Sequence, residues 1–302
     1  MRPAAPLEES PVSTPIVCPR RSALYLPGSN PRALEKARTL AADVLILDLE
    51  DAVAPAAKEE ARRLVVEAVK GGGFGQRELV IRVNGAATPW GADDLAAAAR
   101  AGAEAVLLPK VESAEEVQRA EASLRAGGAP GSLRLWAMIE TPRGVLAAPT
   151  IAAASPRLAC LVAGTSDLVK DLRARQTTGR AEVLTALSLV VLAARAHGLG
   201  CLDGVHLDLA DEAGFEGHCR QGRDLGFDGK TLIHPKTIAA ANRAFAPGAE
   251  EIDAARRILV AHAEAESFGK GVVVVDGRLV EALHVEAARR LLALAEAVAA
   301  RG

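Results

Sequence analysis

The sequence predicts an α/β fold, a (β/α)8 barrel followed by a C-terminal helical extension. Eight short runs rich in Leu and β-branched residues recur, and each ends at polar, Gly or Pro residues. An Ala-rich segment with helical spacing of its apolar residues follows most of these runs. Alternating strand–helix units form a parallel sheet with right-handed crossovers, and eight such units close into a TIM barrel. An open doubly wound sheet is the alternative.

The eight runs have the character of strands that are buried on both faces. The second, "DVLILDLED", is apolar without alternation until its acids, as in parallel sheets covered by helices. The fifth, "LWAMIETPRG", ends in Glu140 before a Thr-Pro-Arg-Gly break that suits the start of a helix. In chain order we expect strands within 23–29, 43–51, 78–85, 105–113, 135–144, 158–168, 201–208 and 226–235.

The remaining segments divide the chain of 302 residues into three parts. Residues 1–20 are Pro-rich and lack the apolar core of a signal peptide, which predicts a flexible tail. The catalytic barrel should occupy 21–235, because single barrels of about 250 residues are common. Residues 236–302 read as helices with a short ribbon turning at "VDG", an extension for oligomerisation or for covering the site.

Composition excludes several classes of protein. Aromatic residues make up only 3% and the formal charge is −2, so neither stacking platforms nor a basic footprint for nucleic acid is present. No apolar run approaches the roughly 20 residues that span a bilayer. The four cysteines lie far apart without a CxxC pair, so we expect neither a zinc ribbon nor disulfides, and we expect a cytoplasmic protein.

Acids and bases dominate the predicted carboxyl ends of the strands, which a barrel brings to one mouth. Glu140 and Asp167 supply one carboxylate each from adjacent strands, which suits Mg²⁺. For each residue taken singly, a helix cap or a solvated loop position is the alternative. The charged and polar strand ends are Asp48, Glu50, Asp51, Arg82, Asn84, Lys110, Glu112, Glu140, Arg143, Thr165, Asp167, His206, Asp208, Lys230 and His234.

From about residue 21 onward, an ordered set of segments resembles the citrate lyase β-subunit family of the wider HpcH/HpaI aldolase group. The resemblance implies a barrel with a helical extension, assembled as a trimer or hexamer. It further implies Mg²⁺-dependent cleavage of a carbon–carbon bond in malyl-CoA, β-methylmalyl-CoA, citramalyl-CoA or a carried citryl group. The matching segments are "RSALYLPGSNPRALEKA", "LILDLEDAVAPAAKEEAR", "VIRVNG", "LLPKVES", "MIETPRG", "GTSDL" and "DLGFDGKTLIHPKTI".

The resemblance also implies roles for individual residues. The family's metal ligands match Glu140 and Asp167, and its substrate-binding arginine matches Arg82. In such chemistry Mg²⁺ acts as a Lewis acid while a guanidinium stabilises the developing oxyanion. Asp48, Glu50 and Asp51 match a segment whose acids orient metal-bound waters and position the arginine, although Asp51 also suits a helix N-cap.

Two turns could hold a substrate carboxylate through backbone N–H groups. Pro27 and Gly28 end the first run, and Gly164 and Thr165 follow the sixth. A plain turn is the alternative in both places.

Three further basic residues have weaker interpretations. Lys58 and Arg62 lie at helical spacing and could meet CoA phosphates, but a solvated helix face is the preferred interpretation. For His234 we prefer a buried structural histidine over a substrate-binding one.

The C-terminal segment departs from the lyase pattern. Where family lyases commonly carry Asp, "GRLVEAL" places Glu281 at the position of the proposed catalytic acid or base. This form resembles a branch of malyl-CoA thioesterases, in which Glu281 could act as a general base toward water. The main reading is a lyase that cleaves a carbon–carbon bond of a short 3-hydroxyacyl-CoA. The alternatives are a thioesterase that hydrolyses the same ester and a subunit of a citrate lyase-type complex.

Overall fold

The computed structural model describes residues 18–269 and 271–301. Most of the predicted tail, residues 1–17, lies outside the described residues. The described residues divide into two compact units, Arg20–Ala246 and a second unit of residues 18–19, 247–269 and 271–301.

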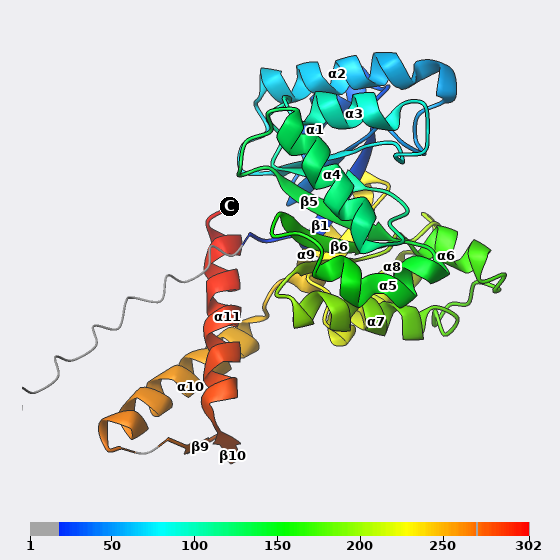
Figure 1. Ribbon diagram of the computed structural model, residues 1–302. Helices are drawn as coiled ribbons and strands as arrows, with labels where there is room; N and C mark the ends of the chain where they lie inside the picture. The colour runs from blue at the N-terminus through cyan, green and yellow to red at the C-terminus, as the bar shows by residue number, and fades with distance from the viewer. Residues whose placement is uncertain (1–17, 270, 302) are drawn as a thin grey trace, which may run out of the picture. The chain divides into compact units, whose positions relative to one another are not determined.

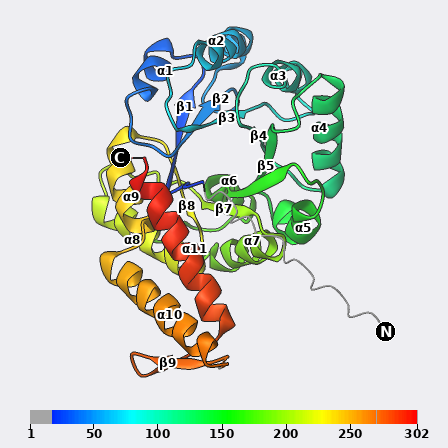
Figure 2. The ribbon, with the colours of Figure 1, turned by 90° about the vertical axis from the view of Figure 1, so that its left-hand side faces the viewer.

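The first unit is a closed barrel of eight parallel strands in sequence order (Figures 1 and 2). The last strand pairs with the first, with Ser22 opposite Lys230, so the prediction of a closed barrel is confirmed and the open sheet is excluded. The strands are β1 (Ser22–Pro27), β2 (Val44–Asp48), β3 (Glu78–Arg82), β4 (Ala105–Leu108), β5 (Arg134–Ile139), β6 (Leu158–Ala163), β7 (Gly200–Asp203) and β8 (Gly229–Leu232).

Helices lie outside the ring of strands (Figure 2). Local sequence signals begin several of them: Asn30 caps α1, Thr141 caps α5 and Asp211 caps α8, each by accepting a backbone N–H. The helices of this unit are α1 (Pro31–Ala37), η1 (Pro55–Ala57), α2 (Lys58–Gly71), α3 (Gly91–Ala98), α4 (Ala114–Ala126), α5 (Pro142–Ala152), α6 (Thr165–Asp171), α7 (Leu184–Ala196), α8 (Glu212–Leu225), η2 (Pro235–Thr237) and α9 (Ile238–Phe245).

Strand residues alternate between two apolar cores. In β2, Val44 and Ile46 point into the barrel and pack in one cluster with Trp136, while Leu45 and Leu47 join the cluster that packs against the helices. All four side chains are fully buried, which explains why the second run of the sequence lacks the alternation of a half-exposed strand. Apolar side chains of the inner cluster fill the interior of the barrel, and polar side chains lie at the carboxyl ends of the strands.

The second unit contains α10 (Ala249–Ser267), β9 (Val273–Val275), β10 (Arg278–Val280) and α11 (Ala282–Ala299). The ribbon predicted from "VDG" is present, because β9 and β10 pair antiparallel around Asp276 and Gly277. Both turn residues have positive φ, 50° and 76°, as a tight hairpin turn requires. In the described part of the chain, no helix has both the length and the apolar character needed to cross a membrane.

An ion cluster with no solvent exposure at its centre joins β7, β8 and the loop before α7. Lys230 Nζ donates to Asp203 Oδ2 at 2.7 Å, and Arg180 Nη1 reaches both oxygens of Asp203 at 2.7 and 2.8 Å. Asp203 and Lys230 are fully buried. Burial raises the pKa of Asp203, but the charges of Lys230 and Arg180 outweigh it and lower the pKa.

We predict that Asp203→Asn lowers the free energy of unfolding by about 3 kcal/mol, because it leaves the ammonium of Lys230 buried without a counter-charge. Urea unfolding measures this difference. Glu60→Gln is the matched control, since the ion pair of Glu60 with Arg63 is exposed on α2. Equal unfolding curves for Asp203→Asn and the control would show that the buried cluster contributes nothing to stability.

Candidate active site

A cavity of about 330 Å³ opens at the carboxyl ends of the strands. Charged groups line part of its wall, and Val205, Leu207 and Ile233 contribute an apolar part. The other lining residues are Tyr25, Asp48, Asp51, Ala52, Arg82, Met138, Glu140, Ala163, Gly164, Thr165, Ser166, Asp167 and Thr231. The barrel thus collects six of the ten predicted site residues around one space: Asp51, Arg82, Glu140, Gly164, Thr165 and Asp167.

Arg82 is fixed by a two-point contact with Asp48. Its Nε and Nη2 donate to the two carboxylate oxygens of Asp48, both at 2.6 Å, and its guanidinium lies 4.7 Å from the ring centre of Tyr25. Asp48 also accepts the backbone N–H groups of Glu50 and Ala52. Because Arg82 ends β3 and Asp48 ends β2, the parallel register itself places the two side chains together. The guanidinium therefore presents a fixed donor to the cavity.

Glu50 lies between two cations at the mouth. Its Oε1 accepts a hydrogen bond from Lys110 Nζ at 2.6 Å. Arg82 Nη1 lies 2.8 Å from Oε2, yet no hydrogen bond with adequate geometry reaches that buried oxygen from the described residues. Burial is the largest influence on this carboxyl and raises its pKa, against the opposing charge of Arg82. Glu50 therefore keeps one oxygen without a hydrogen-bond donor.

Glu140 follows β5 directly and is only 1% exposed. Its Oε1 accepts the backbone N–H of Lys110 at 2.7 Å. Burial raises the pKa of Glu140 from 4.5 to about 7; the charge and N–H of Lys110 oppose this change, whereas Glu50 and Asp167 add to it. Gly164 makes room for the side chain, since a Cβ there would lie 2.3 Å from the Cβ of Glu140.

Asp167 lies in the first turn of α6, with its side chain 26% exposed. Its carboxylate lies 3.8 Å from Lys110 Nζ and 3.6 Å from Lys170 Nζ. Among the described residues, no group of three or more His, Cys, Asp or Glu is arranged to hold a metal ion by itself. Two carboxylates at one cavity nevertheless fit Mg²⁺, which takes one or two protein carboxylates and completes its shell with water and substrate oxygens.

Other residues singled out from the sequence lie at different distances from this space. Asp51 is largely exposed, 3.5 Å from Arg82 and 3.9 Å from Lys110, and it does not cap α2, which begins at Lys58. Pro27 and Gly28 do not line the cavity. The N–H of Gly28 donates to the carbonyl of Asp48, so the structure gives this glycine a close packing contact with β2.

Glu281 belongs to the second compact unit. It immediately precedes α11 and is exposed, and its backbone N–H donates to Nδ1 of His284. Its carboxylate is therefore in contact with solvent in the described chain. A catalytic role for Glu281 stays a prediction.

Two weaker interpretations were wrong. Lys58 is buried and donates to the carbonyls of Leu49 and Glu50, while Arg62 pairs with Asp94, so neither forms a solvated face. His234 is exposed, and its Nδ1 accepts the N–H of Lys236 at the start of η2. The sequence pattern of a helix or a strand end does not reveal such long-range partners.

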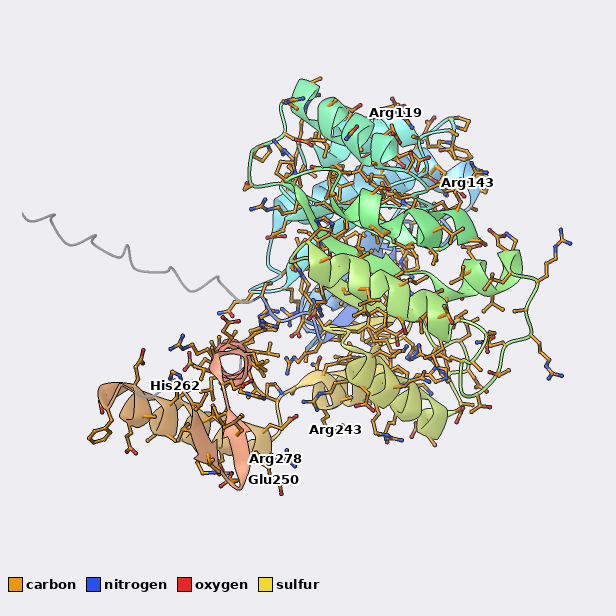
Figure 3. The ribbon with its side chains drawn as sticks, turned by 60° about the horizontal axis from the view of Figure 1, so that its bottom comes forward. Arg119, Arg143, Arg243, Glu250, His262 and Arg278 are labelled. Carbon is orange, nitrogen blue, oxygen red and sulfur yellow. The ribbon has the colours of Figure 1, made fainter. Side chains whose placement is uncertain are left out.

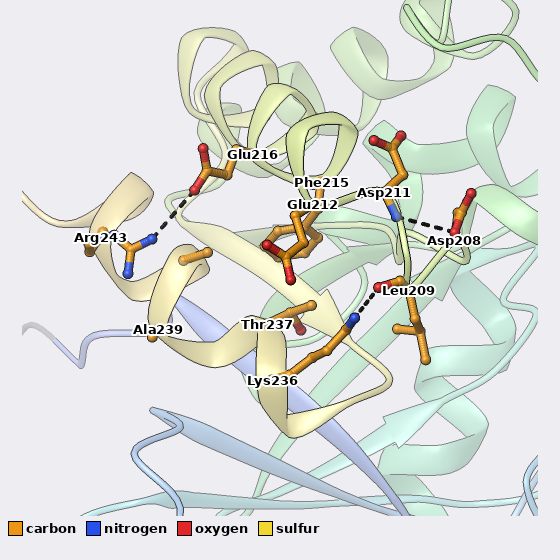
Figure 4. Close-up of a pocket in the computed structure, with 11 residues that line it drawn as sticks. Asp208, Leu209, Asp211, Glu212, Phe215, Glu216, Lys236, Thr237, Ala239 and Arg243 are labelled. Atoms are coloured by element: carbon orange, nitrogen blue, oxygen red, sulfur yellow. Dashed lines mark hydrogen bonds and ion pairs between the residues drawn. The ribbon is translucent and has the colours of Figure 1, made fainter.

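A smaller pocket of about 150 Å³ lies between α8, α9 and the loop after β7 (Figure 4). Its charged groups have local roles: Asp208 accepts the N–H of Asp211, Glu216 pairs with Arg243, and Lys236 donates to the carbonyl of Leu209. It offers no group of acids and bases that converge on a common point comparable to the barrel mouth. We therefore take the cavity at the strand ends as the candidate active site.

The raised pKa of Glu140 predicts a pH-dependent cost in the metal-free protein. In the unfolded chain this carboxyl ionises near pH 4.5, but in the fold it ionises near 7, so stability falls as pH rises through that window. A carboxyl that ionises one pH unit higher in the fold than in the unfolded chain costs about 1.4 kcal/mol of stability once it is charged. In EDTA, Glu140→Gln should therefore be more stable than the wild type by more at pH 8 than at pH 5. Urea unfolding measures the difference in free energy of unfolding between the variant and the wild type. If this difference is the same at both pH values, the cost of burying the Glu140 charge is absent.

Comparisons with known proteins identify the family of the chain. The family model for HpcH/HpaI aldolase/citrate lyase matches residues 21–235. A (3S)-malyl-CoA thioesterase of Cereibacter sphaeroides (strain ATCC 17025) is 51% identical over 94% of this chain and 97% of that protein. The citrate lyase subunit beta of Escherichia coli (strain K12) is 38% identical over 92% and 93%. A crystal structure of the protein CitE from Mycobacterium tuberculosis in complex with magnesium, acetoacetate and coenzyme A matches with a TM-score of 0.73 and 33% identity, covering 91% of this chain and 97% of that one. The chain belongs to the HpcH/HpaI aldolase/citrate lyase family.

Proposed function

We propose that this protein is a Mg²⁺-dependent thioesterase that hydrolyses a short 3-hydroxyacyl-CoA of the malyl-CoA type. The observation that carries the proposal is the similarity to (3S)-malyl-CoA thioesterases, which reaches 51% identity over 284 residues and extends beyond the barrel. Similarity to citrate lyase β subunits is lower, at 38%. The departure of Glu281 from the lyase pattern supports the same choice.

Glu140 and Asp167 would hold the ion at the cavity wall. When bound, Mg²⁺ supplies a Lewis acid that polarises an oxygen of the acyl group. A relative whose crystal structure contains magnesium, acetoacetate and coenzyme A supports magnesium as the ion. Burial of Glu140 favours a divalent cation, because the ion offsets the cost of a carboxylate that has little contact with water.

Arg82 would stabilise negative charge as water adds to the thioester carbonyl. Its contact with Asp48 fixes the guanidinium before substrate arrives, so the reaction does not have to reorganise it. The apolar wall formed by Val205, Leu207 and Ile233 would receive the uncharged part of the acyl group. These three residues would therefore limit the size of the acyl group.

Glu281 would take a proton from the attacking water. A carbon–oxygen bond forms, the carbon–sulfur bond breaks, and the proton passes to the departing thiolate, giving a hydroxy acid and free CoA. The family resemblance implies that the C-terminal segment covers the active site of a neighbouring subunit. We therefore expect a homotrimer or homohexamer. We also expect a cytoplasmic enzyme without a nucleic-acid or membrane partner.

Cleavage of a carbon–carbon bond is the second candidate. Arg82, Glu140 and Asp167 are the residues that the resemblance assigns to lyase chemistry, and all three line one cavity. The products would be acetyl-CoA or propionyl-CoA and a 2-oxo acid, from malyl-CoA, β-methylmalyl-CoA or citramalyl-CoA. A subunit of a citrate lyase-type complex is a variant of this candidate.

One assay separates these candidates. Pure protein is incubated with Mg²⁺ and (S)-malyl-CoA or citramalyl-CoA, and free thiol and 2-oxo acid are measured together. The proposal expects thiol without 2-oxo acid, and loss of turnover in EDTA. Release of 2-oxo acid without thiol would replace the thioesterase by the lyase.

We predict that Arg82→Lys lowers kcat roughly 100-fold, because lysine keeps the charge but loses the planar two-point contact with Asp48. Arg143→Lys is the matched control: Arg143 also follows a strand end but its side chain is 79% exposed (Figure 3). Steady-state kinetics of both variants provide the test. If Arg82→Lys is as fast as the wild type, the guanidinium takes no part in the chemistry.

We predict that Glu281→Gln suppresses turnover while CoA-ester and metal binding persist, and that Glu281→Asp raises the ratio of 2-oxo acid to thiol. The shorter carboxylate moves by about 1 Å, enough to favour a different proton transfer. Glu286→Gln, an exposed acid of α11, serves as the control. Unchanged rates and product ratios in both Glu281 variants would identify this residue as a surface acid.

A further inference from the structure

Lys110 contacts the candidate metal site with both ends of the residue. Its backbone N–H donates to Glu140 Oε1 at 2.7 Å, and its ammonium lies 3.8 Å from Asp167 Oδ2. The same ammonium donates to Glu50 Oε1 at 2.6 Å and lies 3.9 Å from Asp51. In the described part of the chain, one lysine thus reaches both predicted metal ligands and the two neighbouring acids.

The backbone at Lys110 is adapted to this double contact. Its φ is 49°, in the left-handed region that residues other than glycine rarely adopt. Such a conformation persists when surrounding contacts stabilise it, here the N–H bond to Glu140 and the following pairing of Val111 N–H with the carbonyl of Met138. The turn after β4 therefore directs the side chain across the mouth of the barrel.

The charge balance at the mouth explains what the ammonium does there. Arg82 donates two hydrogen bonds to Asp48, and its Nη1 also lies 2.8 Å from Oε2 of Glu50. Glu50 and Glu140 are buried, so their charges are screened little by water. The Lys110 side chain is 43% exposed and carries its charge on a flexible stem. It can leave the acids for solvent, whereas Arg82 cannot.

We propose that Lys110 is the internal counter-cation of the carboxylate site: it neutralises Glu50 and Asp167 in the metal-free protein, and a divalent cation displaces its ammonium from Asp167. Lys110 is therefore a positioning residue that sets the metal affinity of the site. This inference rests on the proposed metal ligands Glu140 and Asp167. Its consequence is that each binding event exchanges a monovalent cation for a divalent one, which lowers the affinity of the site for the metal.

Removal of the lysine charge tests the proposal without an activity measurement. Free Mn²⁺ is followed by electron paramagnetic resonance at fixed pH and ionic strength, with Mn²⁺ replacing Mg²⁺. Lys110→Met should bind Mn²⁺ about tenfold more tightly or better, because two unit charges about 4 Å apart interact strongly outside bulk water. Lys110→Arg should stay close to the wild type, because it keeps the charge. Equal or weaker binding by Lys110→Met would overturn the proposal.

Lys170→Met is the matched control. Lys170 also approaches Asp167, at 3.6 Å, but from the exposed side of α6, where its side chain is 76% exposed. This variant should change Mn²⁺ affinity less than twofold. If Lys170→Met tightens binding as much as Lys110→Met, the effect is a general one of surface charge and the proposal fails.

Two further measurements keep the test decisive. The double variant Glu140→Gln, Asp167→Asn should no longer bind Mn²⁺ at this site; if it binds Mn²⁺ as the wild type does, the proposed metal ligands are wrong whatever Lys110 does.

If Lys110→Met is unfolded without metal, thermal scans with Mn²⁺ should show a cooperative unfolding transition again, because the ion replaces the missing charge. Failure of Mn²⁺ to restore folding, together with unchanged affinity in Lys110→Gln, would overturn the proposal.

Discussion

Burial of negative charge at the barrel mouth is the constraint on which the rest of the site depends. Glu140 is almost completely removed from water, and Glu50 has one buried oxygen without a hydrogen bond from the described residues. A fold tolerates such groups only when cations or polar donors compensate them. Arg82 and Lys110 supply part of that compensation, and a divalent cation between Glu140 and Asp167 would supply the rest. Burial of the Glu140 carboxylate raises its pKa and so destabilises the metal-free protein at high pH. The same burial favours the metal binding that we propose.

The register of the strands brings the charged groups of the barrel mouth together at one place. Asp48 and Arg82 meet because β2 and β3 are parallel neighbours, and Glu140 fits against the next strand because Gly164 has no Cβ. In the function we propose, the barrel would present the same guanidinium and carboxylates to the acyl-CoA, whichever bond is broken. In our account Glu281 selects hydrolysis, and that residue belongs to the other compact unit. If Glu281 has this role, a change in the second unit would switch the reaction while the barrel stays the same.

The sequence predicted the barrel and most of its mouth because both depend on local pattern. Short apolar runs predicted the eight strands, and charged residues at their ends predicted the convergence of Arg82, Glu140 and Asp167 on one cavity. Lys110 appeared only as one polar strand end, since neither its positive φ nor its contacts with Glu50 and Asp167 leave a trace in spacing. The burial of Lys58 was missed for a similar reason: the loop after β2 must fold back to bring the carbonyls of Leu49 and Glu50 to it, and Asn84 reaches it only after β2 and β3 pair.

The central claim is that Glu140 and Asp167 together hold a divalent cation at the mouth of the barrel. Anomalous diffraction from crystals soaked in Mn²⁺ tests it most directly, because the signal locates the ion without reference to turnover. The account predicts a single strong peak within bonding distance of one oxygen of Glu140 and one of Asp167, with Lys110 Nζ moved away from Asp167. Absence of a peak there at saturating Mn²⁺, or a peak bound to other residues, would contradict it.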